Sequence, residues 1–489
     1  MKLTDLVEST RGRVVRSGHS DFVRVIINTR EAVPGDLFFA LPGVGRDGHD
    51  FVADAARRGA SGAVVSRSVG DLPDGFTVVE VPDVPAALRE LGRARRRASR
   101  ATVVAVTGSA GKTTTKNMIT HVLGARHPVL ASQASFNNHL GVPLTLCAVE
   151  PEHTFVVAEI GTNARGEIDD LAALVEPDVG VITNIGFAHI GNFADQRELA
   201  TEKTDLLERV RAGGDWVLNG DDELLITTAA GRRRGQTVLT RVGFRPDNDI
   251  RALDVTVDEH GSRGTIAVDG RLLPFQLGVS GHHFVRAALA AVAVARIGGD
   301  DVGEAVDALE GFTAPPGRAS LLRLTPSLLV LDDSYNASPD ATLAALDLLD
   351  AVRAERAVAV IGEMRELGAH SARLHRLVGA KAARTATDLI TVGAAGEELR
   401  AAAVEHGLDP ARVWDADSAR EAYLYTRKIV DGGGVCAILI KGSRFTHMER
   451  VHLGLSGRMI GCGLDSCHLY IHCSGCSALE TGELAEAGP

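Results

Sequence analysis

Short apolar runs alternate with amphipathic stretches over most of this 489-residue chain. Between residues 101 and about 312, the runs 156–160, 179–182 and 216–218 have the length and composition of buried strands. Amphipathic helices are expected between them, including an alanine-rich helix over residues 283–297. This alternation is typical of a parallel sheet that carries helices on both faces.

The same alternation restarts after Thr313-Ala314-Pro315-Pro316-Gly317, the strongest linker signal in the chain. Beyond it, strands are expected over residues 328–331, 357–361, 388–392 and 435–440, and a helix over residues 340–352. A doubly wound, Rossmann-like domain has this size and order of elements.

A smaller α/β unit precedes both, with strands expected at residues 23–27 and 37–41 and a basic connecting helix over residues 85–100. We therefore predict an α/β chain of three domains. They are a small N-terminal domain (residues 1–85), a central parallel-sheet domain (86–313) and a C-terminal Rossmann-like domain (314–455), followed by a cysteine-rich tail (456–489).

The stretch ATVVAVTGSAGKTTT, residues 101–115, predicts a nucleotide site. It reads as a strand, a glycine loop at residues 108–113 and a helix from residue 114, and helix N-termini of this kind bind phosphate. The expected phosphate-binding residues are Gly108, Ser109, Ala110, Gly111, Lys112, Thr113 and Thr114. Lys112 supplies a point charge and the Thr113 hydroxyl a Mg²⁺ ligand. The alternative is a glycine turn with an incidental lysine. The strand before the loop and the helix after it argue against this alternative.

Polar residues follow the predicted strands at the edge where ligands bind in parallel sheets. Glu159 and His189 can complete a Mg²⁺ shell, although each has a plainer reading, as a turn cap and as a loop histidine. Lys203 lies in a predicted helix, where a solvated side chain is the default. In the C-terminal domain, Asp332 and Asp333 can bind ribose or a Mg²⁺-bound phosphate, or they can form a helix cap.

Composition and charge narrow the class of protein. The net charge of −11 argues against nucleic acid or an anionic membrane as a general partner, and aromatic residues are only 4%. We expect no signal peptide and no membrane span, since no apolar stretch is long enough. Two of the six cysteines, Cys147 and Cys436, stand in apolar runs and are expected to be reduced.

These motifs resemble those of the Mur ligases of peptidoglycan synthesis, most of all the type that adds D-alanyl-D-alanine to UDP-N-acetylmuramoyl-tripeptide. The resemblance covers about the first 455 residues. It rests on PGDLFFALPGVGRDGHDF (34–51), TGSAGKTTTK (107–116), FNNHLGVPLTL (136–146), EIGTNARGEI (159–168), PPGR (315–318), DDSYNASPDATLAAL (332–346), GEMRELG (362–368) and KGSR (441–444).

The resemblance implies an ATP- and Mg²⁺-dependent amide ligase that forms an acyl phosphate. It implies catalytic roles for Lys112, Lys203, His189 and Arg318. ATP would also contact His283, Asp332 and Asp333, and metal would be held by Thr113, Glu159, His189 and Lys203 as its carbamate. The substrate ligands would be Asn28, Thr29, Arg30, Gly43, Asn137, Asn138 and Asn336. We expect a cytoplasmic monomer.

The chain departs from the family pattern on the helix that lines the adenine, where Phe284 and Ala287 replace asparagines. We expect Phe284 to be available for stacking on the base. The residues around Lys203 also differ from the family pattern, and Asn28 stands where the family usually has aspartate. These departures leave an alternative: a ligase of specialised metabolism with the same chemistry on another acid and amine. A third hypothesis is a protein that binds nucleotide sugar or partners without turnover.

The tail matches nothing in the family. Four cysteines, Cys462, Cys467, Cys473 and Cys476, lie there with His468 and His472. Cys473-x-x-Cys476 has the spacing of a zinc knuckle, so the tail is a candidate Zn²⁺ site. The alternatives are a reduced, loosely ordered extension or a tail whose reading frame departs from the ancestral one.

Overall fold

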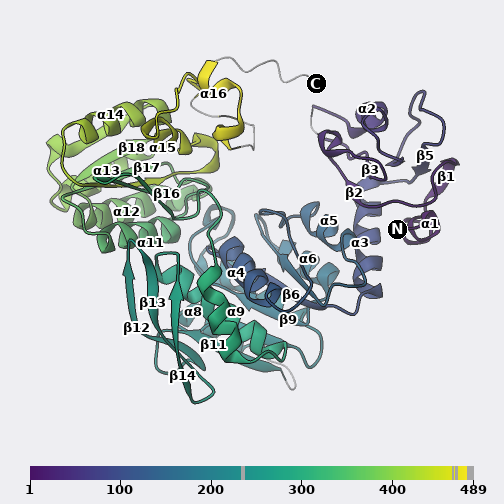
Figure 1. Cartoon of the computed structure of the whole chain (residues 1–489), viewed down its shortest axis with the longest axis horizontal. Coiled ribbons are helices and arrows are strands. Elements are labelled where there is room, and N and C mark those ends of the chain that lie inside the picture. Colours follow the sequence, from purple (N-terminus) through teal and green to yellow (C-terminus); the bar gives the residue numbers. More distant parts are fainter. Residues whose placement is uncertain (44, 233–236, 465–466, 468–471, 482–489) are drawn as a thin grey trace.

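The computed structural model describes residues 1–43, 45–232, 237–464, 467 and 472–481. In that part of the chain, sheets lie in succession along the sequence, one for each predicted domain (Figure 1). The predicted α/β class with three domains is confirmed. None of the described helices is both long and apolar enough to cross a membrane.

The N-terminal sheet has the strand order β1-β5-β4-β3-β2, with β1 antiparallel to β5 and the remaining pairs parallel. Its strands are β1 (Arg13–Arg16), β2 (Val25–Ile26), β3 (Leu37–Phe39), β4 (Gly62–Val65) and β5 (Thr77–Glu80), with helices α1 (Leu3–Thr10) and α2 (Val52–Arg57). The strands predicted at residues 23–27 and 37–41 exist but are shorter than expected.

Helix α3 (Val84–Ala98) connects this domain to the central one. Asp83 caps it by accepting a hydrogen bond from the Ala86 amide, and Pro85 occupies the first turn. Near its end, the buried Arg96 donates to the carbonyl of Val175 and pairs with Asp178. The helix is therefore fixed to the central domain through a buried guanidinium.

The central sheet has the order β14-β13-β12-β11-β10-β9-β6-β8-β7. Its strands are β6 (Thr102–Thr107), β7 (Val129–Ala131), β8 (Phe155–Glu159), β9 (Val179–Ile182), β10 (Asp215–Asn219), β11 (Val238–Gly243), β12 (Ile250–Asp258), β13 (Gly261–Val268) and β14 (Arg271–Leu277). Helices α4 (Lys112–Gly124), α9 (His282–Ile297) and α10 (Val302–Asp307) pack in one apolar core. Helices α5 (Gly141–Cys147), α6 (Glu167–Val175), α7 (Gln196–Glu208) and α8 (Glu223–Ala230) contribute to the other core.

The sheet is parallel from β7 to β12, as expected, but β12, β13 and β14 form an antiparallel meander that we did not predict. Asp269 and Gly270 join β13 to β14, and both have positive φ, 49° and 74°. Such a two-residue turn suits the twist of a hairpin, and Asp-Gly is its usual sequence.

The C-terminal sheet has the order β15-β16-β20-β17-β18-β19, antiparallel only at β15. Its strands are β15 (Ser320–Thr325), β16 (Leu328–Asp333), β17 (Arg356–Gly362), β18 (Asp388–Val392), β19 (Val413–Ala416) and β20 (Cys436–Lys441). Its helices are α11 (Pro339–Ala351), α12 (Ser371–Thr385), α13 (Gly396–Glu405), α14 (Ala419–Asp431) and α15 (Glu449–Leu455).

The described part of the tail packs against this domain. Leu479, in the short helix α16 (Ala478–Thr481), joins Leu453, Ile460 and Cys473 in a small buried cluster. These described residues are thus packed on α15.

Candidate functional site

A cavity of about 1420 Å³ lies between the central and C-terminal domains. It is bounded by the ends of β6, β8 and β9 on one side and of β16, β17 and β20 on the other, as expected for parallel sheets. Of the residues predicted from sequence, it is lined by Ser109, Ala110, Gly111, Lys112, Thr113, Thr114, Asn137, Asn138, Glu159, His189, His283, Arg318, Asp333 and Asn336.

The glycine loop after β6 is braced from β9. The carbonyl of Asn184 accepts from the Ser109 amide at 3.0 Å, and its side-chain oxygen accepts from the Ala110 amide at 2.9 Å. Gly108 has φ 144°, and a Cβ there would lie 1.9 Å from the Thr183 hydroxyl. Only glycine therefore fits at this position. A loop without side chains here also lets its backbone approach a phosphate closely.

Helix α4 begins at Lys112, two residues earlier than predicted. Lys112 donates from Nζ to the Gly108 carbonyl at 2.9 Å, so its ammonium lies over the loop. Burial lowers the pKa of Lys112, while the nearby negative charge of Glu159 opposes that shift and Arg318 adds to it. The lysine and the carboxylate therefore act on one another across the cavity.

Glu159 ends β8 and is 1% exposed. Its Oε1 accepts from Asn137 Nδ2 at 2.8 Å, but its Oε2 is buried and has no hydrogen-bond partner in the described chain. A buried carboxylate oxygen without a donor is costly unless a ligand satisfies it. Hard cations such as Mg²⁺ take oxygen ligands, so this residue fits a magnesium site.

His189 adopts the left-handed conformation, with φ 62°, in the segment after β9, where it precedes the short 3-10 helix Ile190–Asn192. Its Nδ1 forms an ion pair with Glu366, which comes from the C-terminal domain. Hydrogen bonding to His189 lowers the pKa of Glu366. The imidazole thus links the two domains at the cavity.

Lys203 is 1% exposed, so the default of a solvated lysine is wrong. Burial lowers its pKa well below the ordinary value, and the charge of Lys112 lowers it further. Its neighbour Glu202 is also buried and accepts from the amides of Gly166 at 2.7 Å and Ile168 at 2.9 Å. Glu202 therefore caps α6 and holds the loop that follows Glu159.

Arg318, just beyond the interdomain linker, already lies at the glycine loop. Its guanidinium donates to the Thr113 hydroxyl at 3.2 Å and stacks 4.0 Å from the ring centre of Tyr335. The Tyr335 hydroxyl in turn is 2.6 Å from Ser135 Oγ of the central domain. A cation from one domain is thus held at the phosphate loop of the other.

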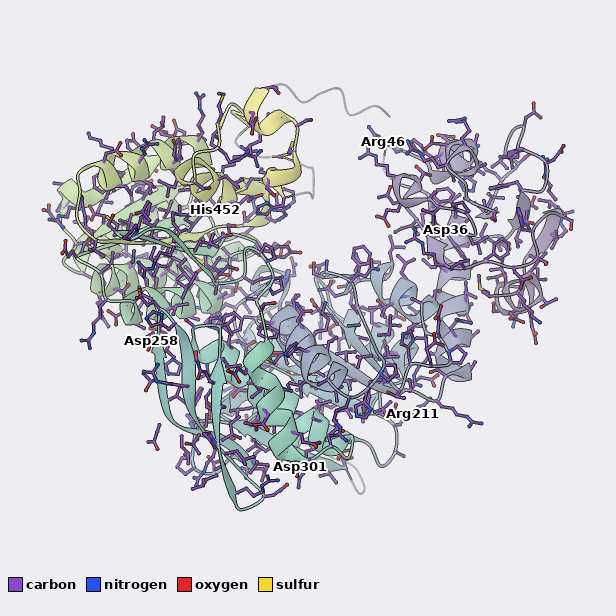
Figure 2. All side chains as sticks on the ribbon, in the orientation of Figure 1. Asp36, Arg46, Arg211, Asp258, Asp301 and His452 are labelled. Atoms are coloured by element: carbon purple, nitrogen blue, oxygen red, sulfur yellow. The ribbon has the colours of Figure 1, made fainter. Side chains whose placement is uncertain are left out.

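The two aspartates at the end of β16 separate. Asp333 lines the cavity, and its Oδ2 pairs with the buried Lys441 at 2.7 Å. Asp332 is buried outside the cavity, where it accepts from the Ser334 amide and lies 3.6 Å from Nδ1 of His452. Figure 2 labels His452, which lies on α15. The structure therefore brings only Asp333 to the cavity.

On α9, His283 lines the cavity and Phe284 does not. Phe284 is fully buried, with its ring 6.2 Å from that of Phe312 in the central core. The expectation that Phe284 is available for stacking on a base is therefore wrong. Ala287, the other departure from the family pattern, does line the cavity.

The residues predicted to bind the uridine end, Asn28, Thr29, Arg30 and Gly43, lie in the N-terminal domain and do not line this cavity. Figure 2 labels Asp36 and Arg46 in this domain, on the right of the view, whereas His452 of the C-terminal domain is on the left. Asn28 caps a short helical turn by accepting from the Arg30 amide. Asn138 likewise caps α5, accepting from the Gly141 amide.

Comparison with known proteins identifies the family. The Mur ligase middle domain matches residues 106–295, and the Mur ligase, glutamate ligase domain matches residues 317–444. The UDP-N-acetylmuramoyl-tripeptide–D-alanyl-D-alanine ligase of Bacillus subtilis (strain 168) is 31% identical over 452 residues, which cover 91% of this chain and 96% of the relative. This chain belongs to the Mur ligase family.

Two further comparisons agree. The ligase of the same name from Escherichia coli (strain K12) is 33% identical over 440 residues, covering 87% of this Mur ligase and 92% of the relative. A crystal structure of MurF from Acinetobacter baumannii superimposes with a TM-score of 0.83 at 28% identity, covering 94% of this chain and 99% of that one. The protein is thus an ATP-dependent ligase of the MurF type.

Several residues at the site of this Mur ligase were not singled out from sequence. Tyr335, Glu366 and Ser135 act across the domain boundary, which no local pattern reveals. Lys116, one turn after the glycine loop, is 2% exposed and donates to the carbonyls of Ser132 and Ala134, both at 2.6 Å. Its neighbours Thr115 and Asn117 are polar, so the sequence gave no local sign that this lysine is buried and must find acceptors.

Proposed function

We propose that this Mur ligase joins D-alanyl-D-alanine to UDP-N-acetylmuramoyl-tripeptide with hydrolysis of ATP, in the cytoplasmic synthesis of peptidoglycan precursor. One observation carries the proposal: a glycine loop, a buried carboxylate with a free oxygen, and a guanidinium from the second domain meet in one cavity. Relatives of this type, similar over most of their length, support the same substrates.

The residues present suit ATP and Mg²⁺. Lys112 would contact the β- and γ-phosphates and Thr113 one Mg²⁺, with Glu159, His189 and carbamylated Lys203 around a second. The ions would neutralise charge on the transferred phosphoryl group. From the C-terminal side, Arg318 and Asp333 would hold the nucleotide, and His283 would approach it from α9.

The chemistry follows from these groups. The tripeptide carboxylate attacks the γ-phosphate and ADP leaves, which gives an acyl phosphate. The amine of D-alanyl-D-alanine then attacks the acyl carbon, and the tetrahedral intermediate expels phosphate and releases one proton from the amine nitrogen as the amide forms. The chain's own contribution is to position the reactants and to balance their charge, as Lys112 and Arg318 are placed to do.

We place the uridine end of the substrate on the N-terminal domain, at Asn28, Thr29, Arg30 and the loop with Gly43. Its peptide end would then reach Asn137, Asn138 and Asn336 at the cavity. Because Asn137 Nδ2 already donates to Glu159, this asparagine would also fix the carboxylate that faces the metal.

Phosphate release from ATP tests the proposal, measured with UDP-muramoyl-tripeptide, with and without D-alanyl-D-alanine. Release that requires both substrates supports it. Release that appears only with other acids or amines would instead assign the chain to the alternative, a ligase of specialised metabolism. Ala287, which lines the cavity and replaces an asparagine of the family, would then be the first residue to test for a role in this difference. An absence of release with every pair would mark a binding protein without turnover.

A further inference from the structure

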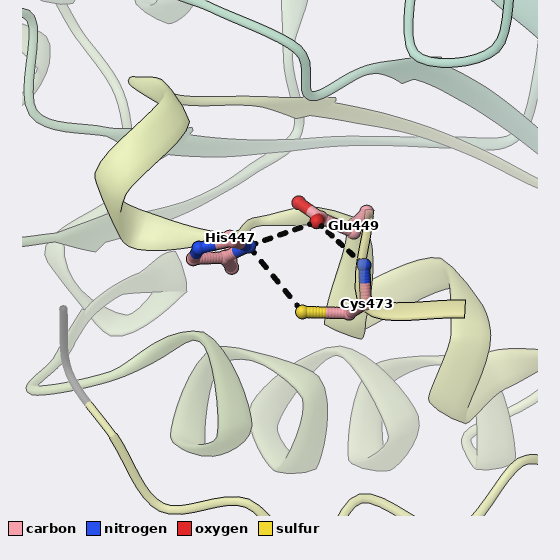
Figure 3. Close-up of side chains that lie close together, drawn as sticks. All are labelled: His447, Glu449 and Cys473. Carbon is pink, nitrogen blue, oxygen red and sulfur yellow. Dashed lines mark hydrogen bonds and ion pairs between the residues drawn. The ribbon is translucent and has the colours of Figure 1, made fainter. Parts of the chain in front are cut away.

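A second set of metal-ligating side chains lies where the tail meets the C-terminal domain (Figure 3). His447 follows the KGSR motif, Glu449 opens α15, and Cys473 comes from the tail. All three are buried, and their ligand atoms lie within 4.8 Å of one another. No other group of three such ligands is found in the described chain.

Two of the contacts within the cluster meet at a single nitrogen. Nδ1 of His447 lies 3.0 Å from Oε1 of Glu449 and 3.3 Å from Sγ of Cys473, as Figure 3 shows. When Nδ1 carries the proton, its one N–H cannot serve both neighbours fully. Oε2 of Glu449 is also buried and has no hydrogen-bond partner among the described residues. The cluster therefore holds acceptor capacity that its own donors do not fill.

We propose that His447, Glu449 and Cys473 bind one Zn²⁺-like divalent ion. Imidazole nitrogen, carboxylate oxygen and thiolate sulfur are the ligand types that zinc takes, and three such side chains leave one position of a tetrahedral ion open. On binding, the Cys473 thiol releases its proton to solvent, so one thiolate and one carboxylate balance the charge of the ion.

The surroundings of the cluster suit a metal-bound thiolate. Arg450, itself buried, donates from Nε to Cys473 Sγ at 3.4 Å, and hydrogen bonds of this kind orient metal ligands. Arg444 and the Cys473 amide both donate to Oε1 of Glu449, at 3.1 Å and 3.2 Å. Two guanidinium groups also repel a cation, so we expect weaker binding than at a site of four thiolates.

This ligand set differs from the one that the tail's spacing predicts. Cys476 would be the partner of Cys473 in a zinc knuckle, but it is not in the cluster. His468, another candidate, lies outside the described residues. The difference gives a matched control, because Cys476 and Cys473 lie in the same short segment and only one of them belongs to the proposed site.

The site would also join the tail to the ligase cavity. Arg444 lines that cavity, and its partner Glu449 is one of the proposed ligands. An ion on Glu449 would compete with Arg444 for the carboxylate and would hold the tail against α15.

The test uses the full-length protein, treated with a chelator and then titrated with Co²⁺ as a spectroscopic substitute for Zn²⁺. We expect one equivalent to bind to the wild type and to Cys476→Ser, with a thiolate-to-cobalt absorption band. Cys473→Ser should lose the band. His447→Gln should weaken binding by at least about tenfold. Zn²⁺ should raise the thermal unfolding midpoint of the wild type and of Cys476→Ser, but not of Cys473→Ser.

Two results would overturn the proposal. The first is that the folded wild type, checked by circular dichroism, takes up no stoichiometric Co²⁺ or Zn²⁺. The second is that Cys476→Ser loses the band while His447→Gln keeps it, which would assign any ion to the knuckle. If Cys473→Ser fails to fold, His447→Gln and the wild-type titration still decide between these outcomes.

Discussion

At the scale of single residues, the cavity is defined by charges taken out of water. Lys112 and Glu159 act on one another there, and Lys203 is buried with the positive charge of Lys112 nearby. An isolated buried ammonium is expensive, so each lysine must either lose its proton or be balanced by an anion. Phosphate oxygens, a metal-bound carboxylate or a carbamate would each do so, which is why the buried lysines point to function rather than to packing.

Lys112→Ala should abolish turnover and leave the fold intact. The substitution removes the charge that would face the transferred phosphate, and losing one such donor costs about 10²–10³-fold in rate. Phosphate release and the thermal unfolding midpoint are the measurements. Lys428→Ala, at an exposed position of α14, is the control. Undiminished turnover in Lys112→Ala would refute the assignment of the loop.

Lys203→Ala tests whether a carbamate forms. The lowered pKa of Lys203 favours the neutral amine, which is the form that reacts with carbon dioxide. The variant should lose activity and regain part of it when short-chain carboxylic acids are added, since these can occupy the space of the carbamate. The same acids should do nothing for Lys112→Ala. Lack of rescue would leave Lys203 with a purely structural role.

At the scale of elements, α9 shows how helix geometry decides which neighbour reaches a ligand. His283 and Phe284 are adjacent in sequence, so they point about 100° apart around the helix. One faces the cavity and the other packs in the core against Phe312. Substitutions on such a helix can be interpreted only once it is known which of its faces points into the cavity.

The imidazole of His283 should make stability depend on pH. Burial lowers its pKa to about 4, and Lys441 adds to the shift while Asp333 opposes it. The unfolded chain, with a pKa near 6.5, therefore binds more protons than the folded one between these values. Stability should fall as pH drops from about 6.5 to about 4 and then level off.

The variant His283→Gln isolates this effect. Urea unfolding at pH 7 and at pH 4 should show that the wild type loses more stability than the variant, by no more than about 3 kcal/mol. Equal losses in both proteins would mean that His283 does not contribute. The comparison is needed because many carboxylates also titrate in this range.

Elements that depend on residues close together in the sequence could be predicted. Elements that depend on the pairing of separate segments could not. The strand, glycine loop and helix around Lys112 depend on neighbours in sequence, and so does the strand-end position of Glu159. The meander of β12, β13 and β14 was not predicted. Its sequence does show alternating apolar and polar residues and the Asp269-Gly270 turn, and the alternation corresponds to the burial pattern of β12. The contacts of Tyr335 and Glu366 depend on how two domains meet, which no segment of sequence encodes locally.

At the scale of the whole molecule, the cavity lies where the central and C-terminal domains meet, through a shared apolar cluster and through polar contacts. His189 pairs with Glu366, and the Phe187 amide donates to Asp340 at 2.6 Å. The Gly191 amide donates to the carbonyl of Glu366 at 2.9 Å. These contacts lie at the edge of the cavity, so we expect them to set how Arg318 is placed relative to the glycine loop.

Gly191→Ala should separate the two halves of the site without damaging either. A Cβ at Gly191 would lie 2.5 Å from the backbone nitrogen of Gly368 and 2.8 Å from the carbonyl oxygen of Glu366. Backbone cannot move aside as a side chain does, so the domains must shift. A misplacement of about 1 Å costs about 10²-fold in rate, and we expect such a fall in kcat.

Binding and turnover should respond differently to this change. The glycine loop and its brace from Asn184 lie wholly within the central domain, so calorimetry with a non-hydrolysable ATP analogue should still detect binding to Gly191→Ala. Gly124→Ala is the matched control, because a Cβ there meets nothing within 4 Å. If both variants turn over at the wild-type rate, the domain contact at Gly191 does not set the geometry of the reaction. A loss of nucleotide binding together with turnover would show instead that the central domain cannot hold nucleotide without its neighbour.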